Sequence, residues 1–483
     1  MLEPSKNCVA VDNVPLCVDL DGTLVRSDTL VEGFARLVRR NLWNCMAVLR
    51  WLLRGRAQLK AEIAARVELD VALLPANEAL LAWLRQEHRS GRRVILCTAA
   101  NESIARRIAA YYAVFDEVIA SSEHHNLKGK AKAECLVSKF GVQGYDYAGN
   151  DLQDLHVWAQ ARKAIVVTPT RGLQRELARL PRVDRIFPNE TKPGKSWLRA
   201  LRLHQWSKNI LIFLPAAGAH RLLQHDVALA SAAAFVIFGV CASGTYLLND
   251  LMDLDADRRH PTKRNRPFAA GTLPLAHAFF VIPALVGAAL LLAALLVGWP
   301  FLAVLVIYVV ATVWYSRSLK RIAMVDVLAL AGLYAVRVIA GAAATAIVPS
   351  FWLLAFTMFL FLSLAMAKRY SELKLMIASG RTHTVGRGYT IDDAPLLQAC
   401  GVASGYIGVL VIALYVNSGI AQNMYGRPEF LWLLCPLLLY WNTRVWLKTS
   451  RGQMHDDPVV FTLQDRPSLI AAGLGLLLIF AAI

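Results

Sequence analysis

The chain has 483 residues, 56% of them hydrophobic, and a formal net charge of +17. A mean hydropathy of +0.42 excludes an ordinary soluble globular protein, and the length is sufficient for two domains. Apolar runs recur only beyond about residue 208, which predicts a soluble domain followed by a membrane domain. The excess Lys and Arg forms no single soluble patch, so we expect contact with lipid and no nucleic-acid partner.

The first motif along the chain is "VPLCVDLDGTLVRSDT", which begins at residue 14. Its apolar run is typical of a buried strand, and Asp19 and Asp21 face one side together where that strand ends. Gly22 and Thr23 then allow a tight turn. No cleavable signal sequence is expected at the start of the chain, so we expect this domain to stay in the cytoplasm. The eight scattered Cys favour free thiols.

Three further motifs follow in order: "VILCTAA" with Thr98, "KGKAKAECL" with Lys132, and "YAGNDLQDL". Together with D-x-D-G-T they resemble the haloacid dehalogenase superfamily over about residues 12–185. The resemblance implies an α/β Rossmann-like fold for residues 1–185, with a helical cap inserted over about residues 28–85. We therefore expect a phosphatase domain at the N-terminus.

The same resemblance implies the roles of individual residues. Asp19 attacks phosphorus to give an aspartyl-phosphate, and Asp21 serves as general acid and then as general base. Thr98 and Lys132 bind the transferring phosphoryl group, with Lys132 preferred to its neighbours because it begins a predicted helix. Mg²⁺ is held by Asp19, Asp21 and Asp151. An inactive descendant of the family is the alternative.

The cap contains a helical stretch, residues 34–67, in which Arg is interleaved among Leu, Trp and Met. Arg beside Trp43 and Trp51 suggests that the cap also rests on the bilayer, whereas plain packing on its own core is the other interpretation. Residues 186–199 are expected to form a linker that enters a short interfacial helix.

Nine apolar segments in the remaining chain are candidate transmembrane helices, judged by length and lack of charge. The connections after the second, fourth, sixth and eighth are basic, so the positive-inside rule places them in the cytoplasm and the C-terminus outside. We therefore predict a multi-pass protein of the inner (cytoplasmic) membrane, with residues 200–483 forming an all-α membrane bundle of nine helices. The candidate spans are residues 209–222, 226–249, 275–298, 299–317, 324–346, 350–369, 396–418, 429–447 and 467–483.

The cytoplasmic end of the second span carries "YLLNDLMDLDADRRHPTKRNRPFAAG", residues 246–271. Its carboxylates and one amide recur at spacings of one, three and four, so on a continuous helix they share a face that suits Mg²⁺. The basic residues that follow are candidates for binding phosphate. A solvated charge cluster at the membrane surface is the alternative. The candidate metal ligands are Asn249, Asp250, Asp253 and Asp257, and the candidate phosphate-binding residues are Lys263, Arg264 and Arg266.

Two further polar stretches lie on the same predicted side of the membrane. Asp326 and Arg337 occur inside an otherwise apolar span, where an ionisable residue costs several kcal/mol to bury and is a functional candidate. "LHQWSKN", residues 203–209, places Gln205, Lys208 and Asn209 at the mouth of the first span.

Together these motifs resemble the UbiA superfamily of intramembrane prenyltransferases, whose N-D-x-x-D-x-x-x-D signature is met by residues 249–257. "QWSKN", "DVLALAGLYAVRVIAG" and "AKRYSEL" are similar to the decaprenyl-phosphate phosphoribosyltransferase branch. Aromatic-acceptor members usually have a second aspartate pair, but Leu330 occupies the position four after Asp326. The departure argues against aromatic acceptors and leaves open whether a second Mg²⁺ binds.

The resemblance implies a bifunctional enzyme. Mg²⁺ on the aspartate face, with Lys208, Lys263 and Arg266, neutralises a departing diphosphate while polyprenyl phosphate attacks phosphoribosyl diphosphate. The phosphatase domain then leaves polyprenyl-phosphoryl ribose. Lys368, Arg369 and Tyr389 are expected to hold a phosphate, with topogenic charge and an interfacial Tyr as the alternative.

Other functions fit less of the sequence. In one alternative, the soluble domain is a noncatalytic regulator or anchor. In a second, both domains are enzymes but act on other prenyl or phosphoryl substrates. A transporter is the third, although no inverted repeat of broken helices is visible. The expected partners are polyprenyl phosphate, phosphoribosyl diphosphate and the lipid bilayer, and a homo-oligomer is left open.

Overall fold

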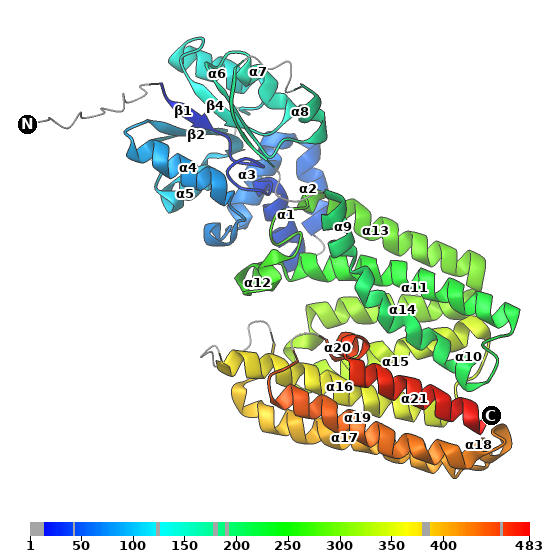
Figure 1. Cartoon of the computed structure of the whole chain (residues 1–483). Coiled ribbons are helices and arrows are strands. Elements are labelled where there is room, and N and C mark those ends of the chain that lie inside the picture. The colour runs from blue at the N-terminus through cyan, green and yellow to red at the C-terminus, as the bar shows by residue number, and fades with distance from the viewer. Residues whose placement is uncertain are drawn as a thin grey trace, which may run out of the picture. The chain divides into compact units, whose positions relative to one another are not determined.

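The computed structural model describes residues 14–41, 44–121, 126–176, 182–188, 193–378, 387–454 and 457–483 (Figure 1). The chain forms two compact units. The first comprises Met1–Ala200 together with Asp253–Phe280, and the second comprises Leu201–Met252 together with Val281–Ile483. Trp43 and residues 189–192 of the expected linker lie outside the described residues.

A parallel sheet of six strands, in the order β3-β2-β1-β4-β5-β6, forms the centre of the first unit. Parallel strands need helical crossovers, and the helices between them cover both faces of the sheet (Figure 1). This arrangement confirms the expected α/β fold. The strands are β1 Leu16–Val18, β2 Val94–Asn101, β3 Glu117–Ser121, β4 Asp146–Gly149, β5 Ala164–Val167 and β6 Val183–Phe187.

The central strand β1 is buried on both faces, as its apolar run predicts. Leu16 and Val18 pack into one core with α4 and α5, whereas Cys17 packs into a second core with α6 to α8. β1 therefore points its carboxyl end, and the aspartates that follow it, at one edge of the sheet. The helices on the two faces are α4 Glu78–Arg89, α5 Glu102–Tyr112, α6 Lys130–Phe140, α7 Leu155–Trp158 and α8 Arg171–Glu176.

Three helices form the cap: α1 Thr29–Arg40, α2 Asn44–Leu53 and α3 Arg56–Arg66. Trp51 is buried in the core of the first unit, and the Arg66 guanidinium lies 4.6 Å from its ring centre. Cap packing therefore accounts for the environment of this Trp. Asp28 starts α1 because its side chain accepts the backbone N–H groups of Leu30 and Val31.

Residues 253–280 pack with the first unit. They contain α12 Leu254–Arg259, the 3-10 turn η5 Lys263–Asn265 and the first residues of α13 Leu275–Leu292. Phe268, Ala269 and Leu273 are almost fully buried, so this connection is a folded part of the unit and not a solvated loop.

The second unit is helical throughout. After α9 Pro193–Leu201, where the chain passes from the first unit into the second, it forms the 3-10 segment η4 Leu203–Phe213 and the helices that follow. The longer helices are α11 His225–Met252, α14 Trp299–Arg317, α15 Val325–Thr345, α16 Phe351–Ala378, α17 Ala394–Val416 and α19 Leu434–Ser450. The shorter ones are α10 Leu214–Gly218, α18 Gly419–Met424, α20 Pro458–Gln464 and α21 Arg466–Ala482.

Seven of the described helices are long and apolar enough to cross a membrane, so the predicted count of nine is not confirmed. The first predicted span, residues 209–222, is divided between η4 and the short helix α10. The last is α21, which has 17 residues and falls short of the roughly 20 that span a bilayer. A run of apolar residues alone cannot distinguish one long helix from two short pieces.

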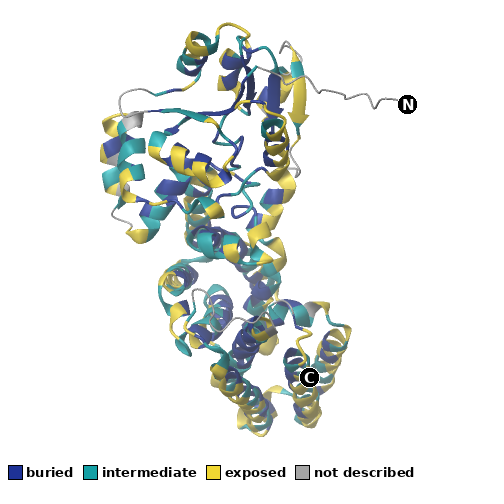
Figure 2. Ribbon diagram, turned by 90° about the vertical axis from the view of Figure 1, so that its left-hand side faces the viewer, coloured by how far each residue is buried: buried dark blue, intermediate teal, exposed yellow. Residues whose placement is uncertain are grey.

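Many residues on the outer faces of the helices are exposed (Figure 2), and large apolar side chains are among them. Leu295, Trp299 and Phe480 are each at least 70% exposed. Large exposed apolar surfaces are unfavourable in water but are ordinary where helices face lipid. The exposed faces and the seven apolar helices identify an integral membrane protein.

Candidate active sites

The first candidate site lies at the carboxyl ends of β1, β2 and β4. The Asp19 carboxylate accepts a hydrogen bond from the Leu20 N–H at 2.9 Å and pairs with Lys132 Nζ at 2.9 Å. Thr98, fully buried near the end of β2, accepts the Ala100 N–H at 3.0 Å. Asp21 accepts the Thr29 N–H at 2.8 Å, so the first residue of α1 orients its carboxylate.

A buried network fixes Lys132. Its ammonium group also donates to the Tyr147 hydroxyl at 2.8 Å, and that hydroxyl donates to Asp154 Oδ1 at 2.9 Å. Asp154 Oδ2 accepts the N–H groups of Asn150 and Asp151, both at 3.0 Å. The network therefore joins the predicted phosphoryl-binding lysine to the loop that carries the last motif.

The last motif turns Asn150, and not Asp151, toward the Asp19 loop. Asn150 Oδ1 accepts from the Thr23 hydroxyl at 3.2 Å. Gly22 has φ of +77°, and a Cβ there would lie 2.2 Å from Asn150 Nδ2, so only glycine allows this contact. Asp151 is exposed and accepts the N–H of its own neighbour Leu152 at 2.6 Å.

Burial raises the pKa of both predicted catalytic aspartates. It raises the pKa of Asp19 to about 6, although the Lys132 charge opposes the rise. It raises the pKa of Asp21 to about 7, and the Asp28 charge adds to the rise. Burial alone lowers the pKa of Lys132, but the Asp19 and Asp154 charges outweigh it, so its pKa is raised and the side chain is cationic.

The aspartate motif of residues 249–257 is distributed over two helices. Asn249 Oδ1 accepts from the Ser316 hydroxyl at 2.9 Å, and Asp250 pairs with Arg202. Asp253 is the N-cap of α12, and Asp257 on that helix pairs with Arg266 at 2.7 Å. Lys263 lies in η5 and is half-buried. The four predicted ligands therefore do not share one uninterrupted helical face.

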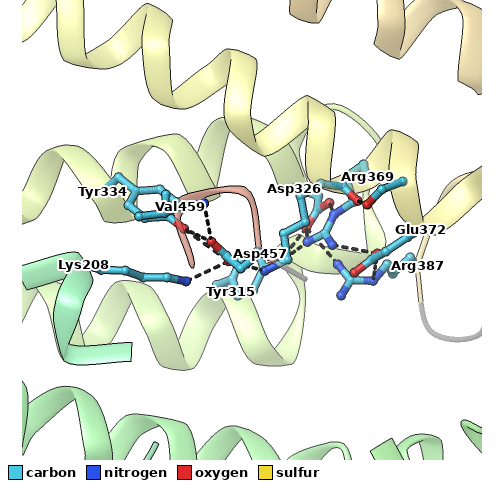
Figure 3. Close-up of polar contacts among 11 residues, drawn as sticks. Lys208, Tyr315, Asp326, Tyr334, Arg369, Glu372, Arg387, Asp457 and Val459 are labelled. Atoms are coloured by element: carbon cyan, nitrogen blue, oxygen red, sulfur yellow. Dashed lines mark hydrogen bonds and ion pairs between the residues drawn. The ribbon is translucent and has the colours of Figure 1, made fainter. Parts of the chain in front are cut away.

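Asp457 in the second unit pairs with Lys208 (Figure 3) and also with a second lysine, Lys368. Lys208 Nζ lies 2.7 Å and Lys368 Nζ 2.8 Å from Asp457 Oδ2. The Tyr334 hydroxyl donates to Asp457 Oδ1 at 3.0 Å, and the Val459 N–H donates to the same oxygen at 3.2 Å. Side chains from η4, α15 and α16 thus converge on the residue that caps α20.

Asp326, at the start of α15, is the centre of a second ionic cluster (Figure 3). Arg369 pairs with both of its oxygens, and the Tyr315 hydroxyl donates to Oδ1 at 2.7 Å. Arg387 lies 3.6 Å from Asp326 Oδ1 and 3.4 Å from Glu372 Oε2, which also pairs with Arg369 at 2.8 Å. The predicted Asp326 and Arg369 are therefore direct partners.

Arg337 is buried in the second unit and donates to Asn209 Oδ1 at 3.1 Å. Its guanidinium lies 5.2 to 5.7 Å from the ring centres of Phe238, Tyr308 and Tyr334, which stabilise a cation away from water. Tyr389 accepts the Met324 N–H at 3.0 Å, next to the Asp326 cluster. The backbone of Gln205 belongs to the η4 segment.

Within the described ranges, no three His, Cys, Asp or Glu side chains come together closely enough to hold a metal ion. The donor chemistry nevertheless fits Mg²⁺ at the first site, since carboxylate and amide oxygens of Asp19, Asp21 and Asn150 border one loop. In the aspartate motif, Arg202 and Arg266 are the present partners of Asp250 and Asp257. A metal bound there would have to displace these cations from the carboxylates.

Several residues of these sites were not predicted from the sequence. Asp457 gives no signal, because it lies in a short polar loop 249 residues along the chain from Lys208. Asn150 and Asp154 lie within the last motif, so its spacing could have identified them. Lys60 of α3 reaches the same edge of the sheet and donates to the Ala99 carbonyl at 2.6 Å.

The fold defines an α/β domain and a bundle of apolar helices, each with its own cluster of buried charged side chains. Residues 210–463, more than half of the chain, match the UbiA prenyltransferase family, and the chain belongs to that family. Residues 16–159 match the haloacid dehalogenase-like hydrolases. Both family resemblances drawn from the sequence are confirmed.

Similar proteins cover one or both domains. The protein y4nM of Sinorhizobium fredii is 34% identical over 95% of this chain and 89% of its own length. Nodulation protein NoeC of Azorhizobium caulinodans is 35% identical over 60% of this chain and 94% of its own. Decaprenyl-phosphate phosphoribosyltransferase of Corynebacterium glutamicum is 35% identical over 44% of this chain and 66% of its own. A UbiA homologue from Archaeoglobus fulgidus, solved with GPP and Mg²⁺, has 17% identity and a TM-score of 0.45 over 59% of this chain and 99% of its own.

Proposed function

We propose that this chain transfers 5-phosphoribose from phosphoribosyl diphosphate to a polyprenyl phosphate and then removes the 5-phosphate. The observation that carries the proposal is the sharing of one carboxylate oxygen, Asp457 Oδ2, by Lys208 and Lys368. Two ammonium groups that point at one oxygen stabilise negative charge at that position. A phosphate oxygen of the substrate can be stabilised by the same two groups. The similarity to decaprenyl-phosphate phosphoribosyltransferase supports the same substrates.

In the transfer step, a phosphate oxygen of the lipid forms a bond to the anomeric carbon of ribose as the bond to diphosphate breaks. Lys208, Lys368 and Arg337 supply positive charge that orients the anionic reactants, and the exposed apolar side chains of the helices suit contact with a prenyl tail in the bilayer. Asn249, Asp250, Asp253 and Asp257 are the candidate ligands of Mg²⁺. When bound, the metal neutralises charge that develops on the leaving diphosphate.

In the second step, Asp19 attacks the phosphorus of the ribose 5-phosphate, and Asp21 donates a proton to the leaving ribose oxygen. Water then attacks the aspartyl-phosphate, and Asp21 accepts its proton, so inorganic phosphate is released. A pKa of about 7 lets Asp21 fill both roles near neutral pH. Thr98 and Lys132 stabilise the phosphoryl oxygens, and Asp19, Asp21 and Asn150 in place of Asp151 are the proposed Mg²⁺ ligands.

Mass spectrometry of lipid products tests both steps. Purified full-length protein is incubated with polyprenyl phosphate, Mg²⁺ and either phosphoribosyl diphosphate or a prenyl diphosphate with an aromatic acceptor. The expected product is polyprenyl-phosphoryl ribose, formed from the first donor alone. A prenylated aromatic product would overturn the transfer assignment. Accumulation of the 5-phosphorylated lipid by wild-type protein would leave the soluble domain as a noncatalytic regulator.

A further inference from the structure

The cap helix α1 holds the chain segment that carries half of the aspartate motif. Arg258 of α12 forms two bonds with Glu32 of α1, at 3.0 and 2.5 Å, and both side chains are almost fully buried. Such a two-bond pair fixes orientation as well as distance. Arg258 also donates to the Ala269 carbonyl at 3.1 Å, so the same side chain holds the folded connection behind α12.

A second contact flanks the first. Arg36 and Arg39 of α1 bind the two oxygens of Asp255 at 2.9 and 3.0 Å. Glu32, Arg36 and Arg39 recur at spacings of four and three, so they form one face of the helix. Asp255 and Arg258 lie on either side of Asp257 in the sequence, and Asp253 caps the same short helix.

Apolar contacts continue the same interface. Phe34 of α1 and Phe279 have ring centres 4.7 Å apart, and Leu254 is almost fully buried. Gly271 has φ of +68°, and a Cβ there would lie 2.8 Å from Arg26 Cβ and 3.0 Å from Pro75. The segment therefore fits closely against the phosphatase domain along much of its length.

We infer that Glu32, Arg36 and Arg39 of the phosphatase cap are positioning residues for the transferase, because they hold Asp253 and Asp257 through α12. The inference rests on the proposed function for its activity test. The segment that carries half of the aspartate motif then depends on the surface of the phosphatase cap, with which it forms one unit. Catalysis at Asp19 is not needed for this role, but the folded cap is.

The double variant Arg36→Gln/Arg39→Gln removes both partners of Asp255 and leaves the buried Glu32–Arg258 pair in place. Transfer should fall about tenfold through a higher half-activating Mg²⁺ concentration, as when residues that orient metal ligands are lost. Hydrolysis of p-nitrophenyl phosphate should stay within about twofold, since neither arginine contacts the phosphatase site. The matched control is Arg93→Gln/Arg106→Gln, which breaks two exposed ion pairs of the same unit.

Asp255→Asn should reproduce the loss, and combining it with the double variant should add little to it, because all three changes break the Asp255 contact. Arg36 also donates to the Glu68 carbonyl at 2.8 Å, but that bond lies within the cap and does not reach α12. Full additivity would overturn the inference, as would a transfer rate equal to that of the control. Hydrogen exchange of residues 253–273 in the full chain should rise in the double variant. Unchanged exchange contradicts the contact itself, whereas absent transfer in wild-type protein contradicts the proposed function and leaves the exchange result standing.

Discussion

The two candidate sites use their carboxylates differently. Asp19 meets one lysine, and its side chain is 13% exposed, so an incoming phosphorus atom can reach it. Asp326 is 0% exposed and lies among Arg369, Arg387 and Tyr315. A nucleophile must remain accessible, whereas a carboxylate enclosed by cations can only organise them. The difference fits the proposed covalent chemistry at Asp19, the covalent site, and the proposed binding of anions in the second unit by Lys208, Arg337 and the groups around Asp250 and Asp457, the electrostatic site.

Among changes at the electrostatic site, Asp250→Ala is expected to reduce the transfer rate most. Loss of one candidate metal ligand, and of the partner of Arg202, should reduce transfer by about 100-fold or more. Phosphatase activity on p-nitrophenyl phosphate should persist, since Asp19 and Lys132 are untouched. Transfer is measured as lipid product by mass spectrometry.

Asp226→Ala is the matched control, because Asp226 is exposed in the first turn of the same helix. It should retain wild-type transfer. Equal activity of the two variants would remove Asp250 from the transferase site.

Asp19→Asn tests the covalent site. The amide has nearly the shape of the carboxylate but is a far poorer nucleophile, so phosphatase turnover should fall by about 1000-fold or more. Transfer should continue, and the accumulated lipid should be heavier than the wild-type product by one phosphate. The control Asp184→Asn alters an exposed ion pair with Lys163 and should give the wild-type lipid.

If Asp19→Asn gives the same lipid as wild-type protein, the phosphatase acts on another substrate or on none. The proposed coupling of the two reactions is then wrong, although the family matches of both domains are unaffected.

Lys368→Met tests whether Lys368 binds a substrate phosphate or only adds positive charge on the cytoplasmic side of the membrane. Lys368 contacts Asp457, whereas Lys374 lies two turns further along α16 with its ammonium 5.7 Å from the Tyr370 ring centre. Lys368→Met should raise KM for an anionic substrate about tenfold with little change in kcat, which is the loss of roughly 1.4 kcal/mol of binding. Lys374→Met should leave KM unchanged. Equal effects would favour topogenic charge at both positions.

Short motifs made the covalent site predictable. Asp19, Asp21, Thr98 and Lys132 stand in ordered motifs next to strands, and the parallel sheet brings the ends of those strands together. The position of Asn150 was not predicted, because the direction of a side chain in a turn depends on a single residue of register.

The electrostatic site was predictable only in part. Lys208 and Arg337 were found as charges beside or within apolar runs, yet Asp457 pairs with Lys208 across 249 residues, and no spacing reveals such a contact. The predicted face of four ligands assumed one continuous helix, but α11 ends at Met252. The packing of residues 253–280 on the cap likewise depends on tertiary contacts.

The last prediction concerns proton competition for Mg²⁺ at the covalent site. Burial raises the pKa of Asp19 to about 6 and that of Asp21 to about 7, with neighbouring carboxylates adding to both. Mg²⁺ binds the deprotonated groups, so below these values it must displace protons. Its apparent affinity should fall by up to about tenfold per pH unit for each proton released.

Calorimetric titration of Mg²⁺ into the Asp250→Ala variant, at roughly pH 5 and roughly pH 8, isolates the covalent site and checks this dependence. The sign follows from the raised pKa values: protonation is complete well below them, and metal binding is strongest well above them. Asp21→Asn removes the carboxyl with the higher pKa, so the Mg²⁺ affinity of that variant should change little above about pH 7. An affinity that is equal at both pH values would mean that these carboxylates do not hold the metal, and the proposed phosphatase site would have to draw its ligands from elsewhere in the loop.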